Sequence, residues 1–215
     1  MLRLYDFLPS GNGYKIRLLL SQLKLPFERV ELNILKGETR TTDFLNKNPN
    51  GRIPLLETQS GQLLAESNAI LFYLSEKTKF LPNDSFLRSQ VLQWLFFEQY
   101  SHEPYIATSR FWISILGKAE EYRDALEQKR EPGYAALNVM EKHLTFHSFF
   151  VGESYSIADI SLFAYTHVAH EGGFELTKFP AIQAWLKRVK AQSRHISINN
   201  ECQFQSVSGE TKHQT

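Results

Sequence analysis

Asn50-Gly51-Arg52-Ile53-Pro54 and, further along the chain, Glu66-Ser67-Asn68-Ala69-Ile70 are the most informative stretches of this sequence. Between them, Ile53–Glu57 and Gln62–Ala65 lie on either side of the turn residues Ser60-Gly61, a pattern that predicts a β-hairpin. The second stretch continues in apolar residues, which favours a helix packed against a sheet. The two stretches therefore mark the entry to a hairpin and the start of the helix that follows it.

The residues before this hairpin alternate between strand-like and helix-like patterns. Leu2–Tyr5 and Phe27–Leu32 alternate apolar with polar or amphipathic side chains, which indicates two strands. A short helix is expected near 41–46. The resulting order, β-α-β-α-β-β-α, predicts a parallel first pair of strands with a right-handed crossover and an antiparallel last pair. The first helix, from Asn12, has apolar residues at helical spacing, namely Ile16, Leu19, Leu20 and Leu23.

The composition changes near Phe80-Leu81-Pro82-Asn83-Asp84, where proline and asparagine indicate a linker. Beyond it the patterns are helical, with almost no strand signal. Long helices are expected at about 86–116 and 119–146. The second should be interrupted near Pro132, because proline starts or kinks a helix rather than lying in its regular interior.

Two further helix starts can be read from the sequence. Ser156-Ile157-Ala158-Asp159 predicts a capping box with Asp in place of Glu or Gln, in which each end residue bonds the backbone of the other. Pro180 is a favourable first-turn residue for a last helix. From about Ser193 the chain becomes polar and is expected to be loose.

The composition excludes several classes of function. The chain has 215 residues, 24 Lys plus Arg and 23 Asp plus Glu, so its formal net charge is +1. Such a balance gives no general attraction to nucleic acid or to an acidic membrane. The single cysteine, Cys202, excludes an intrachain disulfide and a C-x-x-C motif. No secretory signal is visible at the N-terminus, and the cytoplasm is the expected location.

Four motifs together indicate a family. Ser10–Lys15, Asn48–Pro54, Glu66–Ile70 and Ser156–Asp159 occur in the order and at the spacing typical of cytosolic-type glutathione transferases. The sequence resembles that family over roughly residues 1 to 192. The resemblance implies an α/β thioredoxin-like N-terminal domain plus an all-α C-terminal domain. We expect the domains at 1–80 and 86–192, followed by a polar C-terminal tail at 193–215.

The resemblance implies how the backbone of glutathione would be held. In the family the proline of the second motif follows a cis peptide bond, which would present the backbone N–H and C=O of Ile53, before Pro54, to the cysteinyl residue. Ser67 lies at a predicted helix start, where free N–H groups attract a carboxylate. Glu66 would supply negative charge for the γ-glutamyl ammonium. Glutathione is thus the expected co-substrate.

The thiol has several candidate partners. The Asn-Gly pairing of the first motif is similar to that of bacterial subgroups that use Ser, Thr or Asn rather than Tyr near the sulfur. Ser10 lies between the first strand and the first helix, where its hydroxyl and nearby amides would stabilise a thiolate. Asn12, through its side-chain amide, is the second candidate. Tyr5, near the end of the first strand, is the alternative used by other subgroups.

Further candidates surround these residues. Lys36 and Arg40 precede the second short helix, where the family places a basic partner for the glycyl carboxylate, and Asn50 can contribute. An aromatic-rich length of the helix from Phe86 suits an apolar electrophile, with Tyr105, Phe111 and Trp112 as its candidate lining. His167 and His170 share a helical face but have no evident third ligand, so no metal is expected.

The resemblance implies an enzyme, a glutathione transferase whose bound thiolate attacks an apolar electrophile. Disulfide or peroxide reduction at the same site is an alternative, because glutathione itself carries the reactive sulfur. A protein of another class, which binds ligands or partners without turnover, is the remaining alternative. The implied physiological role is detoxification. A homodimer is expected from the family, with no nucleic-acid or membrane partner.

Overall fold

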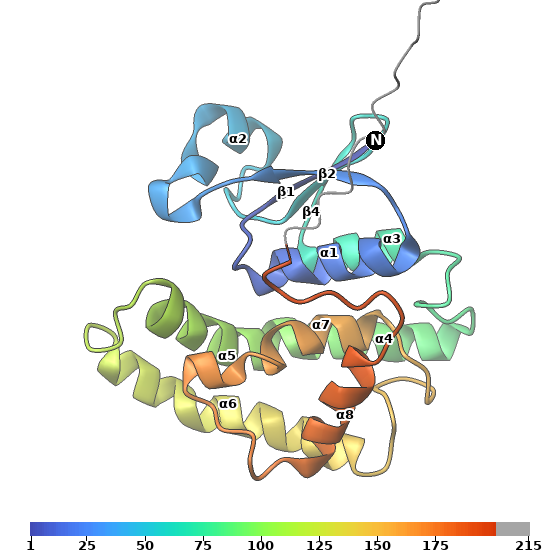
Figure 1. Cartoon of the computed structure of the whole chain (residues 1–215), viewed down its shortest axis with the longest axis vertical. Helices are drawn as coiled ribbons and strands as arrows, with labels where there is room; N and C mark the ends of the chain where they lie inside the picture. The colour runs from blue at the N-terminus through green and yellow to red at the C-terminus, as the bar shows by residue number, and fades with distance from the viewer. Residues whose placement is uncertain (201–215) are drawn as a thin grey trace, which may run out of the picture.

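The computed structural model describes residues 1–200, and the expectations for Cys202 and for the rest of the tail lie outside them. Two layers make up the molecule (Figure 1). The upper layer contains the sheet, and the lower layer is built from helices alone. None of the helices in residues 1–200 is long and apolar enough to cross a membrane.

The N-terminal layer is a mixed four-stranded sheet in the order β2-β1-β3-β4. β1 pairs with β2 in parallel and with β3 in antiparallel fashion, and β3 pairs with β4 in antiparallel fashion. Both predicted strand pairings are therefore confirmed. Its elements are β1 (Leu2–Asp6), α1 (Gly11–Leu23), β2 (Phe27–Glu31), two short 3-10 turns (Ile34–Lys36 and Glu38–Arg40), α2 (Thr42–Lys47), β3 (Leu55–Glu57), β4 (Leu63–Ala65) and α3 (Ser67–Ser75).

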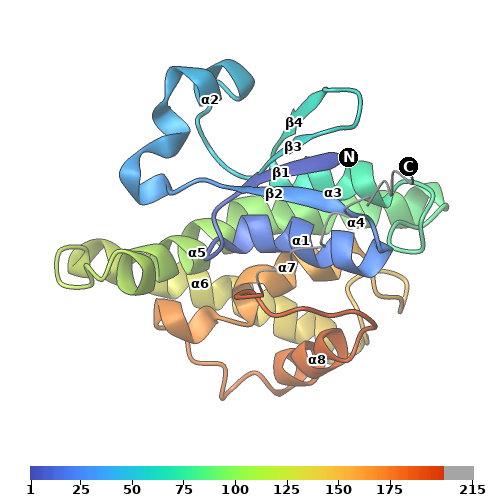
Figure 2. The ribbon, with the colours of Figure 1, turned by 45° about the horizontal axis from the view of Figure 1, so that its top comes forward.

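The two faces of the sheet are covered differently. α1 and α3 lie together beneath it, between the sheet and the C-terminal helices (Figure 2). Leu4 and Leu56 join the main core, which these helices share. Successive residues of a strand point to opposite faces, so Tyr5 and Leu55 lie on the other side, where Phe44 of α2 packs against them.

The C-terminal layer confirms the predicted helical domain. The long helix expected at 86–116 is one continuous run in which two π-helical turns interrupt the α-helical geometry. α7 begins with the capping box predicted at Ser156, and α8 begins at Pro180. The elements are α4 (Ser85–Phe97), the π-turn η3 (Glu98–His102), α5 (Glu103–Arg110), the π-turn η4 (Phe111–Ile115), α6 (Arg123–Leu144), α7 (Ile157–Thr166), the 3-10 turn η5 (Ala169–Gly172) and α8 (Pro180–Lys190).

The interruption expected near Pro132 is wrong, because α6 runs from Arg123 to Leu144 without a break. Gly133 follows the proline and lies directly under the ring of Phe174, where an added Cβ would come within 2.3 Å of a ring carbon. The buried residues of α6 also follow Pro132 in sequence. Packing of this half of the helix onto the core therefore outweighs the local cost of proline.

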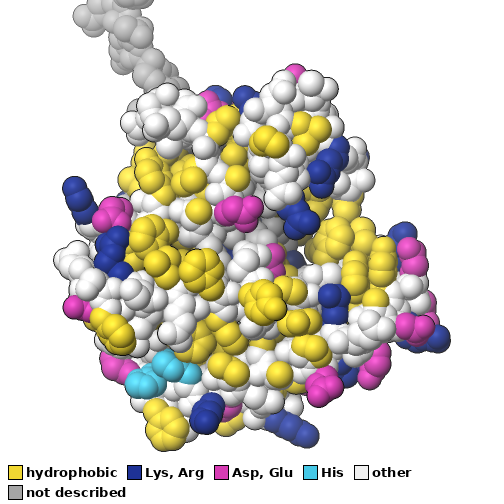
Figure 3. Space-filling model, turned by 180° about the vertical axis from the view of Figure 1, so that it is seen from behind, with side chains coloured by type: hydrophobic (Ala, Val, Ile, Leu, Met, Phe, Trp, Pro, Cys, Tyr) yellow, Lys and Arg dark blue, Asp and Glu magenta, His cyan; other side chains and the backbone are white. Residues whose placement is uncertain are grey.

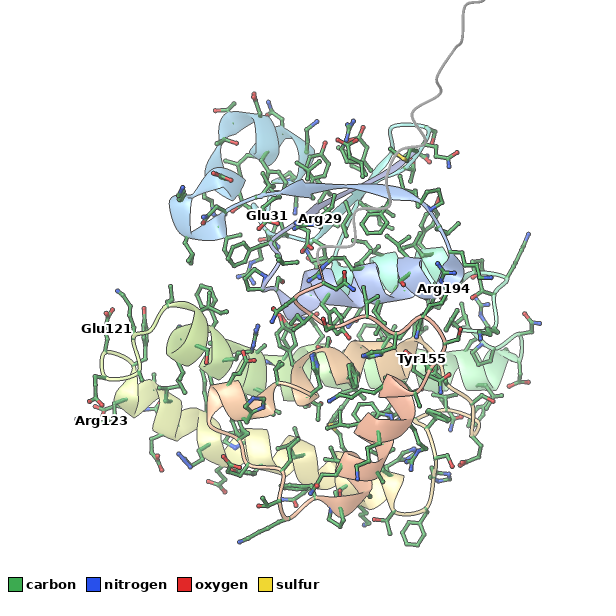
Figure 4. All side chains as sticks on the ribbon, viewed as in Figure 1. Arg29, Glu31, Glu121, Arg123, Tyr155 and Arg194 are labelled. Carbon is green, nitrogen blue, oxygen red and sulfur yellow. The ribbon has the colours of Figure 1, made fainter. Side chains whose placement is uncertain are left out.

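The expectation of a loose chain from Ser193 is wrong for the residues that the structure describes. Arg194, labelled in Figure 4, donates from Nε to the carbonyl oxygen of Ser21 in α1 at 3.0 Å. Ile196 and Ile198 are buried, and Arg17 donates to the Ile198 carbonyl oxygen at 2.8 Å. These apolar side chains, spaced two apart in a polar segment, attach it to α1.

Candidate functional site

A cleft of about 440 Å³ lies between the two layers. The N-terminal domain contributes Ser10, Asn12, Arg40 and Ile53, among others, and the C-terminal domain contributes residues of α5, η4 and α7. A narrower hollow of about 50 Å³ adjoins it and shares four lining residues with it. The shared residues are Asn12, Arg52, Ile53 and Glu103.

Two helix N-termini meet at this site. α1 begins at Gly11 and α3 at Ser67, and residues of both first turns line the cleft or the adjoining hollow. The first N–H groups of a helix have no partner within the helix, and its dipole makes that end electropositive. The site is therefore suited to a ligand with two separate negative groups.

Ser10 is the N-cap of α1. Its Oγ accepts a hydrogen bond from the Gly13 N–H at 3.3 Å. The hydroxyl hydrogen has no acceptor among residues 1–200, so it remains able to donate into the cleft. Gly11, next in the chain, is needed because an added Cβ would lie 2.5 Å from a ring carbon of Tyr165.

Asn12 is held from three directions. Its side-chain Nδ2 donates to Oε1 of Glu103 at 2.8 Å, and its Oδ1 accepts from the Ser67 hydroxyl at 3.1 Å. Its backbone N–H donates to the Tyr165 hydroxyl oxygen at 3.2 Å. An amide NH₂ carries two hydrogens, so one remains available to a ligand. The cross-domain contacts fix the direction in which it points.

A buried charged network supports Asn12 and Ser67 from below. Nζ of Lys15 lies 2.9 Å from Oε1 of Glu98 and 3.3 Å from Oγ of Ser67. Both charged side chains are fully buried. Burial raises the pKa of Glu98, although Lys15 opposes the shift. Asn68 also donates to Glu98, at 3.0 Å, and thereby ties the first turn of α3 to the same carboxylate.

The backbone has unusual geometry in the two stretches Asn50–Pro54 and Glu66–Ile70. The Ile53–Pro54 peptide bond is cis, as the resemblance implied. Glu66, the exposed N-cap residue of α3, has φ of +69°. A non-glycine residue in this region costs about 1–3 kcal/mol, and such outliers gather at functional sites. Ile53, Pro54, Glu66 and Ser67 line the narrow hollow together.

The three candidates for the glycyl carboxylate lie in different places. Arg40 lines the cleft. Asn50 supports it indirectly, because its carbonyl oxygen accepts from Nη1 of Arg40 at 3.0 Å. Lys36 is exposed at the end of a 3-10 turn, away from the cleft lining. Arg52, which lines both cavities, was not predicted.

The aromatic candidates divide between two faces of one helix. Phe111 lines the cleft. Tyr105 and Trp112 lie on another face, where Lys129 of α6 approaches both rings and Tyr122 stacks on Trp112 at 4.5 Å. Their assignment to the electrophile pocket is therefore corrected. They were grouped with Phe111 by composition, whereas the helical repeat separates them.

The expectation that Tyr5 is the alternative partner of the thiol is also corrected. It belongs to the cluster with Phe44 on the far face of the sheet, and its hydroxyl donates to Oε2 of Glu57 at 2.7 Å. Alternation along β1 sends its side chain away from the cleft. The same alternation could have excluded it, since the preceding residue, Leu4, is the one that faces α1 and α3.

The sequence reasoning missed two polar residues of the C-terminal domain. Glu103 faces Asn12, and Arg110 donates from Nη1 to the Pro9 carbonyl oxygen at 2.7 Å. Nε of Arg110 is paired with Glu171 at 2.8 Å, so this guanidinium joins the turn before Ser10 to a second element of the helical domain. Glu103 and Arg110 are seven residues apart, so helical spacing places them on one face. That face was a usable signal.

The described residues 1–200 contain no group of three or more His, Cys, Asp or Glu side chains arranged to hold a metal ion. His167, one of the two histidines considered, contacts the Phe163 carbonyl oxygen through Nδ1 at 2.8 Å and stacks on the Phe163 ring. Burial lowers the pKa of His167 to about 4.

A thioredoxin-like domain with a cis-proline, facing a helical domain across a cleft at the start of α1, defines the two-domain class to which this protein belongs. The chain belongs to the glutathione S-transferase family. Residues 1–76 match the family model "Glutathione S-transferase, N-terminal domain", and residues 94–193 match the model of the C-terminal domain.

Similar proteins include a curated relative and two solved structures. The disulfide-bond oxidoreductase YfcG of Escherichia coli K12 is 31% identical, with 89% of this chain and 91% of that protein covered. A glutathione S-transferase from Pseudomonas fluorescens is 53% identical with a TM-score of 0.91, covering 93% and 99%. The glutathione transferase URE2P8 of Phanerochaete chrysosporium, solved with oxidized glutathione, is 27% identical with a TM-score of 0.80, covering 90% of each chain.

Proposed function

We propose that this protein is a glutathione transferase that binds glutathione in the cleft, stabilises its thiolate and directs it at an apolar electrophile. The observation that carries the proposal is that the first turns of α1 and α3 face two adjoining cavities, with Ser10 at the cleft and Glu66 and Ser67 at the narrow hollow. One helix end suits a thiolate and the other a carboxylate.

Glutathione would lie along the shared wall of the two cavities. The backbone of Ile53, before the cis bond, would pair with the cysteinyl backbone in the manner of an added strand. The free N–H groups at Ser67 would bind the γ-glutamyl carboxylate, and Glu66 would bind the ammonium. Arg40, with Arg52 beside it, would bind the glycyl carboxylate, for which a guanidinium is well suited.

The thiol would lie at the start of α1, within reach of the Ser10 hydroxyl and the free hydrogen of the Asn12 amide. Hydrogen bonds from these donors and the positive end of the helix favour the thiolate over the thiol. The protein supplies no covalent nucleophile. It places the sulfur of glutathione and lowers the free energy of its ionised form.

The electrophile would bind against the apolar part of the cleft lining. Phe7, Ile34, Phe111 and Ile115 are apolar residues of the cleft lining, to which Ser10 also belongs. An apolar substituent on the sulfur would be buried there at a gain of roughly 25 cal/mol per Å² of apolar surface. The cleft would thus hold the product, a glutathione thioether with an apolar group.

Steady-state turnover of glutathione with an activated aryl halide tests the proposal. A charge-assisted hydrogen bond contributes about 1.5–3 kcal/mol, so Ser10→Ala or Asn12→Ala should lower kcat/KM about 10- to 100-fold. Thr58→Ala, in the exposed hairpin turn, is the control and should keep full activity. If the wild type binds glutathione without turnover, and both site variants bind it with the wild-type affinity, the result would instead support a ligand-binding protein of the same fold.

A second candidate function is glutathione-dependent disulfide reduction. The observation that favours it is the 31% identity with the E. coli disulfide-bond oxidoreductase over most of both chains. The same site would serve, because the thiolate of bound glutathione would attack a disulfide sulfur in place of a carbon electrophile. Competing assays with an aryl halide, a mixed disulfide and a hydroperoxide distinguish conjugation from the two reductions.

We also propose that the protein is a homodimer. Between α3 and α4 lies an apolar groove, on the face that Figure 3 presents, where hydrophobic side chains gather. Tyr73 and Phe96 in this groove are 51% and 70% exposed. Phe96→Glu should shift the mass measured by sedimentation to that of a monomer. Phe146→Glu, at a similarly exposed phenylalanine outside the groove, should leave the mass unchanged.

A further inference from the structure

Tyr165 of α7 reaches the thiol site from the opposite domain. Its ring packs on Gly11, the first residue of α1, so closely that an added Cβ there would lie 2.5–2.8 Å from three ring carbons. The side chain is 7% exposed, and it lines the cleft. The ring is therefore fixed against the turn that carries Ser10.

The hydroxyl of Tyr165 has one occupied and one unoccupied hydrogen-bonding position. Its oxygen accepts from the backbone N–H of Asn12 at 3.2 Å. Its own hydrogen has no acceptor within residues 1–200. A buried tyrosine hydroxyl usually finds a hydrogen-bond partner. The cleft beside the first turn of α1 is the space into which this hydroxyl can donate.

We propose that Tyr165 is a further catalytic residue, whose hydroxyl donates a hydrogen bond to the sulfur of bound glutathione. The inference rests on the proposed function, because it requires the thiol to lie at the start of α1. Ser10 and Tyr165 then contact the sulfur with one hydroxyl from each domain. Closure of the two domains around α1 is what completes this pair of donors.

The charged groups around Tyr165 keep it in the donating form. Burial, together with the carboxylates of Glu103 and Glu98, holds the pKa of the Tyr165 phenol well above its usual value, although Arg110 opposes the shift. Nζ of Lys15 lies 5.9 Å from the ring centroid. The hydroxyl therefore keeps its proton at neutral pH and serves as a donor to the thiolate, and the thiol proton leaves to water.

Tyr165→Phe is the decisive variant, because it keeps the ring on Gly11 and removes only the hydroxyl. We expect the apparent pKa of the bound glutathione thiol, followed by thiolate ultraviolet absorbance, to rise by about one unit, a factor of ten. Below that pKa, kcat/KM with an activated aryl halide should fall about ten-fold, and at high pH it should approach the wild-type value. Binding of S-methylglutathione, which has no ionisable thiol, should not change.

Tyr14→Phe is the matched control. The Tyr14 hydroxyl is also buried, and it donates to the Ile196 carbonyl oxygen at 2.7 Å, away from the cleft. Its removal should lower stability and leave the thiol pKa unchanged. A ring-fluorinated tyrosine at position 165 is a more acidic donor of nearly the same shape, so it should lower the thiol pKa. This variant covers the case in which Tyr165→Phe does not fold.

Two outcomes separate the failure of this inference from the failure of the proposed function. If the wild type shifts the thiol pKa but Tyr165→Phe and the fluorinated protein shift it equally, Tyr165 only caps the Asn12 N–H and the inference is wrong. If the wild type itself neither binds glutathione nor lowers its thiol pKa, the proposed function is wrong.

Discussion

Replacement of Asp159 by alanine should destabilise the protein far more than loss of an ordinary helix cap. The carboxylate is fully buried at the start of α7. Oδ1 accepts from Nε1 of Trp185 at 2.9 Å and from the Phe150 N–H at 3.2 Å, and Oδ2 accepts from the Ser156 N–H at 2.9 Å. One side chain therefore joins α8 and the loop before α7 to the helix start.

The size of the effect follows from two opposed contributions. Asp159→Ala leaves buried N–H donors of Trp185, Phe150 and Ser156 without an acceptor, at a cost of about 1–3 kcal/mol each. Against this, the variant no longer ionises a buried carboxylate: desolvation outweighs the hydrogen bonds and raises the pKa of Asp159 from 3.8 to about 6, which corresponds to about 3 kcal/mol at neutral pH. The expected net loss for Asp159→Ala is about 3 kcal/mol.

Asp84→Ala provides the matched comparison. Asp84 caps α4 through a hydrogen bond from the Leu87 N–H at 2.8 Å, but it is exposed. Its loss should cost about 1 kcal/mol, because water replaces the cap. Urea unfolding followed by circular dichroism, at one fixed protein concentration, measures both. Equal losses of about 1 kcal/mol would refute the reasoning that Asp159 joins α7 to α8.

Three further changes have distinct expected results. The free energy of unfolding of the wild type, measured relative to that of Asp159→Asn, should decline as pH rises from about 4 to 6 and stay level above pH 6. The reason is that the pKa of Asp159 is raised to about 6 in the folded state, whereas the ordinary value is 3.8. Urea titrations at several pH values check this, and the same pH dependence of the unfolding free energy in both proteins would contradict it. Gly13→Ala should lower the free energy of unfolding, measured with urea, by ~3 kcal/mol or more. The added Cβ would lie 1.5 Å from Oδ1 of the buried Asp6, and the cost of relieving this clash exceeds the ~1 kcal/mol by which alanine is favoured over glycine in a helix. A stabilised variant would show that the Asp6 side chain moves aside freely. Tyr5→Phe removes the hydrogen bond to Glu57 but no cleft donor, so aryl halide turnover should not change, and a large loss of kcat would return Tyr5 to the thiol site.

The structural features that the sequence predicted correctly depend on residues close to one another along the chain. The alternation in β1 and β2, the capping box at Ser156 and Pro180 at the start of α8 each depend on neighbours within one or two turns, and the structure confirms them. Pro132 shows the limit of that reasoning. Its local preference was read correctly, but the packing of α6 against Phe174 decides the outcome.

The sequence by itself determined the order of elements and the family, because those depend on short-range spacing. The tertiary structure alone decided which face of the helical run through α5 and η4 meets the cleft, so that Phe111 lines it and Tyr105 and Trp112 do not. It also decided that Tyr165 reaches Asn12, 153 residues away. Such contacts form when two domains close on each other, and no local period encodes them.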